Sequence, residues 1–178
     1  ITDKNGCNDT MIKPRYIAVS GPIANFAPAA SGSCLNNAVI FNDSTIADSI
    51  HPISQWQWQY GDNITETLTA PPFQHLYAAA GSYVVKLKVT DSKGCSDSTA
   101  NGTTISISSP KANFTTIDTA SCPGRQVRFV NQSTGPNLSY NWDFGDNATS
   151  ALQAPTHSYS SDGVYTVKLV ITDQYGCS

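Results

Sequence analysis

Residues 142–147 have the sequence Trp-Asp-Phe-Gly-Asp-Asn, and residues 58–63 have the closely similar sequence Trp-Gln-Tyr-Gly-Asp-Asn. Further matching segments surround both copies in the same order. They pair residues 24–26 with 112–114 (Ala-Asn-Phe), 75–77 with 157–159 (His-x-Tyr), 81–83 with 163–165 (Gly-x-Tyr) and 90–95 with 172–177 (Thr-Asp-x-x-Gly-Cys). Such self-similarity indicates that one folding unit occurs twice in tandem.

The spacing of this repeat divides the chain. Equivalent residues lie 88 positions apart early in the repeat, 84 apart at the tryptophan and 82 apart from the histidine onward. The first copy therefore carries short insertions, which we place in loops because loops tolerate changes in length. Residues 21–109 are predicted to form one complete module, and residues 110–178 a second that stops before its last strand. Thr-Asp-x-x-Gly-Cys also occurs at residues 2–7, so residues 1–20 are predicted to be the tail, with the last strand, of a preceding module.

Alternation of apolar and polar residues predicts β-strands inside each module. Tyr83, Val85, Leu87 and Val89 share one face of a run whose other face is more polar, and the second copy repeats this pattern at residues 165–171. About seven short strands per ~80 residues, separated by turn residues, are typical of an immunoglobulin-like sandwich. The sequence thus predicts an all-β fold of tandem immunoglobulin-like β-sandwiches.

The composition excludes some classes of protein. The chain has 10 Lys and Arg residues against 13 Asp and Glu, a formal net charge of −3, and no basic run. Nucleic-acid binding is therefore not expected, because phosphate neutralisation supplies most of that affinity. No apolar run approaches the roughly 20 residues that span a bilayer. Residues 1–20 are too polar for a signal peptide, so an exported protein would carry its signal outside this sequence.

The ordered motifs resemble those of the polycystic-kidney-disease (PKD) domain. The matching positions in the first copy are Trp58, Gly61, Asp62, His75, Tyr77, Gly81 and Tyr83, and those in the second are Trp142, Gly145, Asp146, His157, Tyr159, Gly163 and Tyr165. The first copy departs from the pattern at Gln59, where the family usually has Asp. The resemblance covers nearly the whole chain and implies tandem PKD sandwiches of an extracellular or cell-surface protein. The cysteine-bearing repeat is also similar to those of large bacterial adhesins, including type IX-secreted proteins of gliding bacteria.

The Asp and His residues admit three interpretations. Asp62 with His75 and Asp146 with His157 could suggest acid–base chemistry or a metal site, but they recur at one phase of the repeat, which favours a role in the fold. No catalytic arrangement stands out, and no enzyme activity is expected. Some PKD modules bind calcium, which prefers oxygen ligands, so the resemblance leaves calcium binding open. The weak candidates are Asp43, Asp48, Asp118, Asp143 and Asp146.

The tryptophans could form a sugar-binding platform or a core. Trp58 and Trp142 share a phase of the repeat on a central strand, and such a tryptophan is usually buried. Both are therefore predicted to be core residues. Trp56 lies at the end of an insertion, and its side chain could be buried or exposed.

The five cysteines are the most informative irregularity, because an odd number in an exported protein suggests pairing beyond one module. Cys34 and Cys122 lie between the first and second predicted strands, whereas Cys7, Cys95 and Cys177 lie between the sixth and seventh. These loops occupy opposite poles of a sandwich, but stacking brings the first loop of one module near the second loop of the next. We therefore predict a bridge between Cys34 and Cys177. Cys7 and Cys95 would pair with upstream modules and Cys122 with a downstream one, and the alternative is that the thiols are buried and free.

The function predicted from these features is structural. Stacked sandwiches would form a stiff stalk of a cell-surface adhesin that serves adhesion or gliding. The alternative is a carbohydrate- or protein-binding accessory module of a secreted hydrolase. The expected partners are neighbouring PKD modules of the same chain, with secretion or cell-surface machinery and surface glycans or proteins as further possibilities. No cofactor is implied apart from the open question of calcium.

Overall fold

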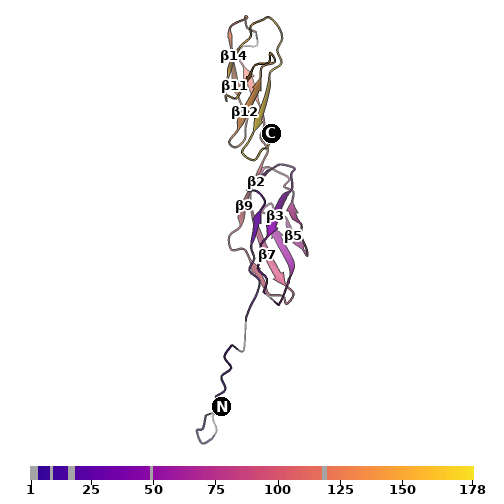
Figure 1. Cartoon of the computed structure of the whole chain (residues 1–178), viewed down its shortest axis with the longest axis vertical. Helices are drawn as coiled ribbons and strands as arrows, with labels where there is room; N and C mark the ends of the chain where they lie inside the picture. The colour runs from indigo at the N-terminus through magenta and orange to yellow at the C-terminus, as the bar shows by residue number, and fades with distance from the viewer. Residues whose placement is uncertain (1–3, 9, 16–18, 49, 118–119) are drawn as a thin grey trace.

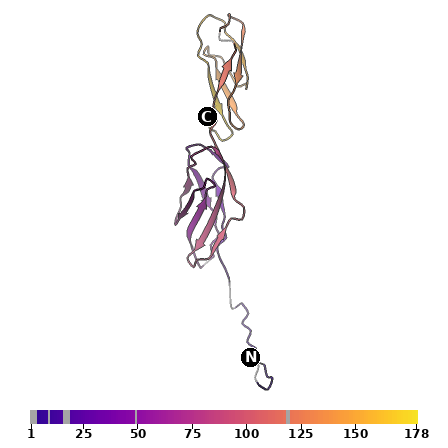
Figure 2. The ribbon, with the colours of Figure 1, turned by 180° about the vertical axis from the view of Figure 1, so that it is seen from behind.

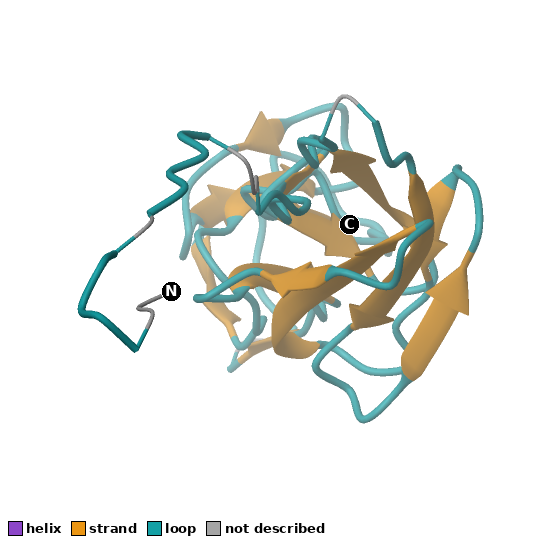
Figure 3. Cartoon of the chain, turned by 90° about the horizontal axis from the view of Figure 1, so that it is seen from below, coloured by secondary structure: helices purple, strands orange, loops and turns teal. Residues whose placement is uncertain are grey.

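The computed structural model describes residues 4–8, 10–15, 19–48, 50–117 and 120–178. Two β-sandwiches follow one another along the long axis of the molecule, and the N-terminal segment extends away from the first (Figures 1 and 2). The described part of the chain contains strands and loops but no helix, which Figure 3 shows along the long axis. The all-β sandwich prediction is therefore confirmed.

The first module packs a three-stranded sheet against a six-stranded one. The smaller sheet has the order β1-β3-β6, and the larger has the order β2-β9-β7-β4-β5, with β8 paired to β7. The strands are β1 (Phe26–Pro28), β2 (Gly32–Cys34), β3 (Val39–Asp43), β4 (Ile53–Gln59), β5 (Thr65–Leu68), β6 (Phe73–His75), β7 (Gly81–Asp91), β8 (Ser96–Ser98) and β9 (Thr103–Ser108). Among the described strands, only β2 and β9 pair in parallel. Strand β2 has three residues and was not predicted from the alternation of apolar and polar residues.

The second module has two three-stranded sheets, ordered β10-β11-β14 and β13-β12-β15. Its strands are β10 (Phe114–Thr116), β11 (Gln126–Asn131), β12 (Ser139–Asp143), β13 (Thr149–Ser150), β14 (Thr156–Ser158) and β15 (Lys168–Thr172). Residues 120–178 contain no counterpart of β2 or β9. The segment 163–167, equivalent to the first half of β7, is correspondingly outside any strand, because a strand needs a partner for its backbone groups.

Each module has its own hydrophobic core around an equivalent tryptophan. Trp58 and Trp142 are both 0% exposed. The Trp58 ring lies 5.0 Å from Phe26 and 5.3 Å from Phe41, between ring centroids. The Trp142 ring lies 5.0 Å and 5.6 Å from the equivalent rings, Phe114 and Phe129. The two blocks of sequence therefore bury equivalent apolar faces in separate cores.

A glycine fixes the turn after each of these tryptophan strands. Gly61 and Gly145 have φ angles of +85° and +83°, which L-residues rarely adopt. A Cβ on Gly61 would lie 2.7 Å from the backbone of Val84, and one on Gly145 would lie 2.6 Å from the carbonyl oxygen of Thr166. The turn therefore requires glycine for its conformation and for close approach to the neighbouring strand.

The strand predicted within residues 1–20 is not formed in the described part of that segment. Residues 4–8, 10–15 and 19–20 belong to no strand, and residues 1–3, 9 and 16–18 lie outside the described residues.

Candidate functional site

The junction between the two modules is crossed by a disulfide. Cys34, the last residue of β2, bonds to Cys177, with an S–S distance of 2.14 Å and a Cα–Cα distance of 5.4 Å. The two residues are 143 positions apart, and Cys177 is buried. Figure 1 shows the C-terminus of the second module beside β2 of the first. This is the pair of cysteines that was predicted from their positions within the sequence repeat.

An aspartate-centred turn positions Cys177 for this bond. One carboxylate oxygen of Asp173 accepts hydrogen bonds from the backbone N–H groups of Tyr175 (2.8 Å) and Cys177 (2.9 Å). Gly176 completes the turn with a φ of +80°. In the first module Asp91 accepts the equivalent bonds from Lys93 (2.8 Å) and Cys95 (2.9 Å). The Thr-Asp-x-x-Gly-Cys repeat therefore forms a hydrogen-bonded turn that holds one cysteine at the same end of each module.

Side chains from both modules meet around the disulfide. A Cβ on Gly32 would lie 2.3 Å from the ring of Tyr175, so β2 presents glycine where that ring packs. Ser108, at the end of β9, and Asp173 are both buried. Burial disfavours ionisation of Asp173, but the neighbouring Ser108 hydroxyl and the backbone N–H groups of Cys177 and Tyr175 outweigh it and hold its pKa below the usual value. These contacts were not foreseen, although the recurring Asp before each Gly-Cys was a visible signal.

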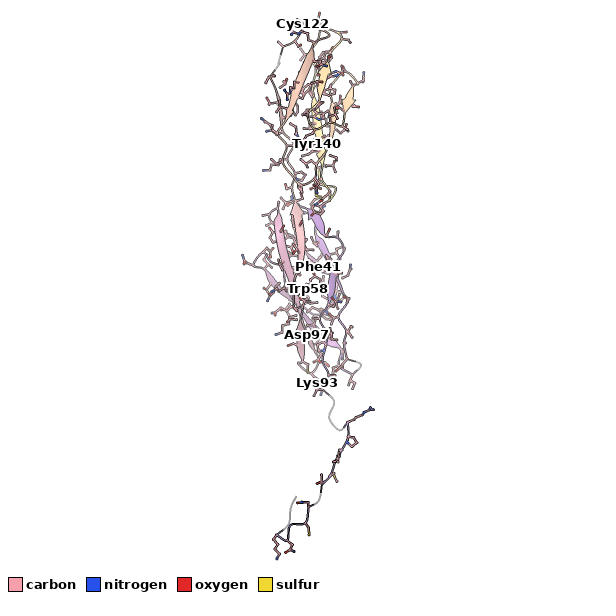
Figure 4. The ribbon with its side chains drawn as sticks, turned by 90° about the vertical axis from the view of Figure 1, so that its left-hand side faces the viewer. Phe41, Trp58, Lys93, Asp97, Cys122 and Tyr140 are labelled. Carbon is pink, nitrogen blue, oxygen red and sulfur yellow. A yellow bond between two sulfur atoms is a disulfide. The ribbon has the colours of Figure 1, made fainter. Side chains whose placement is uncertain are left out.

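Cys7, Cys95 and Cys122 are all exposed. The alternative prediction of buried thiols is therefore wrong. Cys95 and Cys122 are free thiols at opposite ends of the two-module unit. Figure 4 labels Lys93, two residues from Cys95, at the far end of the first module and Cys122 at the far end of the second. Their predicted partners in neighbouring modules, and that of Cys7, stay predictions.

The Asp–His pairs occupy equivalent places in the two modules. His75 Nε2 lies 2.7 Å from Asp62 Oδ2, and His157 Nε2 lies 2.7 Å from Asp146 Oδ2. Each imidazole stacks on the aromatic ring that directly follows the tryptophan strand, with centroids 3.9 Å apart for His75 on Tyr60 and 4.3 Å apart for His157 on Phe144. The occurrence of the same pair in both modules favours a structural role over a catalytic one.

The pairs also hold the turns that follow the tryptophan strands. Burial raises the pKa of Asp62, but the hydrogen bonds from His75 and the N–H of Ile64 outweigh it, so the pKa lies below its usual value. For Asp146 the hydrogen bond with His157 is the largest influence and also lowers the pKa. The adjacent Tyr77 hydroxyl donates to the carbonyl of Tyr60 at 3.0 Å, and burial raises its pKa. The motif residues thus fasten β6 and β14 to the turns that follow β4 and β12.

Three of the weak calcium candidates, Asp43, Asp143 and Asp146, do not converge. Asp43 accepts hydrogen bonds from Thr45 and from the indole N–H of Trp56, in the first module. Asp143 and Asp146 lie in the second module, where their oxygens accept backbone N–H groups of the following turn. Asp118 lies outside the described residues. Within the described residues these carboxylates stabilise turns.

A further weak calcium candidate, Asp48, lies in a group with His51 and Asp91 of the first module, whose possible metal-binding atoms are within 4.8 Å of one another. His51 Nδ1 lies 2.9 Å from Asp48 Oδ2, and Asp48 Oδ1 accepts the N–H groups of Ile50 and His51. From the sequence, His51 was interpreted as a loop residue without a further role. Because Asp48 and His51 already satisfy one another, the group acts as a clamp on the inserted loop in this structure.

The aromatic side chains of the described residues form no row of exposed rings. Trp58 and Trp142 are buried, as predicted. Trp56 is half-buried: its ring lies 5.4 Å from that of Phe73, between centroids, and its indole N–H donates to Asp43 at 2.8 Å. A ring fixed in this way by packing and by a hydrogen bond is part of the sandwich.

The structure therefore defines a tandem of immunoglobulin-like modules joined by a disulfide. A family model described as PKD domain matches residues 19–106 and again residues 107–178. The chain belongs to the PKD domain family.

The chain is similar to parts of much longer collagenase and metalloprotease chains. A microbial collagenase of Vibrio alginolyticus is 46% identical over 57 residues, which is 30% of this chain and 7% of that protein. The pre-pro-metalloprotease PrtV of Vibrio cholerae is 30% identical over 162 residues, which is 87% of this chain and 16% of that protein. The chain thus spans only a small part of the length of these relatives. The crystal structure of the PKD1 domain of PrtV is 34% identical, covers 49% of this chain and 98% of its own, and superposes with a TM-score of 0.40.

The described residues also contain no helix long and apolar enough to span a membrane.

Proposed function

We propose that the two modules form a non-catalytic, disulfide-stiffened spacer within a secreted protein, in the manner of an accessory segment attached to a hydrolase. The observation that carries this proposal is the Cys34–Cys177 bond across the junction. Similarity to segments of a collagenase and a metalloprotease supports the setting, and favours the accessory-module interpretation over an adhesin stalk. A disulfide also suits the oxidising environment outside the cell.

The junction has two covalent connections, which explains why it would be stiff. Strand β9 ends at Ser108, and the backbone of Lys111 already pairs with Thr134 of the second module at 2.8 Å and 2.9 Å. The direct linker is therefore only residues 109–110. A single short linker permits a hinge, because interfaces between domains are usually small. A second connection through Cys34 and Cys177 closes a loop and removes most of that freedom.

The test compares the parent chain with a Cys34→Ser/Cys177→Ser variant by small-angle X-ray scattering and by distance measurement between spin labels, one on each module. The oxidised parent should give one narrow distance distribution, and the variant a broad one. Retained β-sheet circular dichroism in the variant shows that the modules still fold. Identical distributions for the two proteins would refute the spacer mechanism.

A binding role is the second candidate, and the names of the collagenase relatives provide the reason to examine it. It requires a surface that grips a polymer, and the half-buried, hydrogen-bonded Trp56 does not supply an open stacking platform. Co-sedimentation of the chain with collagen fibrils, and a glycan array, test it directly. Saturable binding that is lost in Trp56→Ala but kept in Tyr140→Ala would favour this role over that of a spacer.

An adhesin stalk, with adhesion or gliding as its purpose, would use the same stiff junction. Its support is the similarity of the cysteine-bearing repeat to those of type IX-secreted adhesins. Immunolabelling of intact producing cells distinguishes the settings, because a stalk stays at the cell surface whereas a secreted hydrolase accumulates in the medium.

A further inference from the structure

The end of strand β7 contains a buried carboxylate oxygen without a hydrogen-bond donor. Asp91 is the last residue of β7 and is 3% exposed. Its Oδ1 accepts the N–H groups of Lys93 and Cys95, but its Oδ2 is buried and accepts no hydrogen bond from the described residues. Buried carboxylates are normally paired with a positive group or bind a metal ion, because burial removes the water that would stabilise their charge. The position of Asp91 is therefore suited to a cation.

Two further metal-binding side chains lie beside this carboxylate. One possible ligand atom each of Asp48, His51 and Asp91 lie within 4.8 Å of one another. Three atoms separated by no more than this distance all lie within about 2.8 Å of a common point, and zinc binds nitrogen and oxygen at about 2.0–2.2 Å. An inward shift of at most about 0.6–0.8 Å per ligand therefore brings all three to bonding distance.

The two ligands on the inserted loop are already close to the spacing that an ion requires. His51 Nδ1 lies 2.9 Å from Asp48 Oδ2. Neighbouring ligands of a tetrahedral zinc ion are about 3.4 Å apart, as its bond lengths dictate. The hydrogen bond between Asp48 and His51 thus holds two ligands together, and an ion can take the place of the proton that they share. This hydrogen bond does not include Asp91, whose Oδ2 has no donor.

Backbone hydrogen bonds orient both carboxylates in the same way. Asp48 Oδ1 accepts the N–H groups of Ile50 and His51, while Asp48 Oδ2 faces His51 and also accepts the Ser20 hydroxyl at 2.9 Å. Asp91 likewise uses Oδ1 for backbone N–H groups and leaves Oδ2 without a donor. Each carboxylate is therefore fixed through one oxygen, and such outer hydrogen bonds are what orients the ligands of a metal site.

The chemistry of the three ligands favours one class of ion. An imidazole nitrogen with carboxylate oxygens suits zinc and similar divalent transition metals. Calcium prefers six to eight oxygen ligands, which this group does not supply within the described residues. A dication also balances the charges of the two carboxylates. Three protein ligands leave a fourth tetrahedral position for water.

The second module lacks this group, although it has an equivalent of Asp91. Asp173 makes the same turn, and its Oδ2 also accepts no hydrogen bond from the described residues. However, the neighbour of Asp173 is the Ser108 hydroxyl, and no imidazole or second carboxylate completes a metal-binding group around it in the described part of the chain. The ligands Asp48 and His51 belong to an insertion of the first copy. The group is therefore a property of the first module and not of the shared fold.

We propose that Asp48, His51 and Asp91 bind one divalent transition-metal ion of the zinc type. The ion joins the inserted loop to the end of β7, at the end of the first module where Figure 4 labels Lys93. These two segments already meet there, because the N–H of Ser92 donates to the carbonyl of Pro52 at 3.0 Å. The ion acts as a clamp that stabilises the first module. This inference goes beyond the spacer role and does not depend on it.

The first test is calorimetric titration of the full chain with zinc chloride. The background is Cys7→Ser/Cys95→Ser/Cys122→Ser, since exposed cysteines bind zinc themselves. One equivalent should bind, and Asp48→Asn and His51→Gln should each weaken binding by about tenfold or more, because each removes one of three ligands. Asp162→Asn removes an exposed carboxylate of the second module and is the matched control, which should bind like the parent. Absence of binding, or equal affinities in all four proteins, overturns the proposal.

The second test identifies the ligands by NMR of the imidazole groups in the same background. The chain has only three histidines, so each signal can be assigned. Zinc should shift the signals of His51 and leave those of His75 and His157 in place. Shifts of the other two histidines without that of His51 would overturn the site. A larger response of His51 to calcium than to zinc would overturn the class of ion.

Hydrogen exchange measures the clamp itself. Zinc should slow exchange in residues 91–96 of the parent by about tenfold or more, because a ligand stabilises the state that binds it. It should not do so in His51→Gln. Exchange that is unaffected by zinc in the parent would show that the ion does not hold the end of β7.

Discussion

Replacing Trp58 by alanine should destabilise the first module while leaving the stability of the second unchanged. The ring is fully buried and contacts Phe26, Phe41 and Phe73 with centroids between 5.0 and 5.4 Å away. Removing a large aromatic side chain from a packed core costs about 3–5 kcal/mol. Single domains are stable by only about 5–15 kcal/mol. For a domain of this size the loss corresponds to a fall of roughly 15–30 °C in the melting temperature of that module.

Differential scanning calorimetry with peptide-resolved hydrogen exchange measures this effect separately in each module. In Trp58→Ala, exchange should accelerate in β3 and β7, whereas β11 and β12 should keep their protection. Trp142→Ala is the matched variant and should reverse the pattern. The reasoning fails if either substitution accelerates exchange equally in both modules, because the molecule would then have one continuous core.

Three further predictions concern local contacts. Asp62→Asn should reduce the loss of stability on acidification, measured as urea midpoints from pH 2 to 6. The lowered pKa of Asp62 means that its contribution is present above the unfolded-state pKa of about 3.9 and is lost as the pH falls through the folded value. Equal pH profiles would contradict this. Gly61→Ala should destabilise the first module by about 1 kcal/mol or more beyond Gly94→Ala. Both glycines have positive φ, but only Gly61 has backbone within 2.7 Å of the added Cβ, so equal costs would argue against the contact. Asp173→Ala should slow formation of the junction disulfide on refolding, followed by thiol labelling, because the turn that presents its cysteine loses two hydrogen bonds. An unchanged rate would show that the turn forms without Asp173.

Features that depend on local sequence could be predicted well. Alternation in β7 indicated which side chains face inward, and Val85, Leu87 and Val89 are indeed buried. Trp58 and Trp142 could be assigned to the core because two copies of one motif impose the same environment twice. The cysteine pairing could be proposed across 143 residues for a similar reason, since the phase of each cysteine in the repeat indicated the end of the sandwich at which it lies.

Features that depend on contacts between distant segments could not be predicted. The parallel pairing of β2 with β9 leaves no periodic signal, because β2 has only three residues. The approach of Asp48 and His51 to Asp91 depends on the path of an inserted loop that has no counterpart in the second copy. Likewise, the packing of Tyr175 on Gly32 joins residues from different modules, and neither residue is unusual in its own segment.

The two Asp-centred turns present equivalent cysteines at the same end of the two modules. Both present a cysteine through the same backbone hydrogen bonds, but Cys177 is bonded to the neighbouring module, whereas Cys95 is an exposed thiol. At the opposite pole, Cys34 is bonded and Cys122 is exposed in the same way. Each module thus carries a cysteine at each end, in the same phase of the repeat. Since a disulfide needs Cα atoms about 6 Å apart, the Cys34–Cys177 bond is compatible only with a stacking of the two modules that keeps these two turns together.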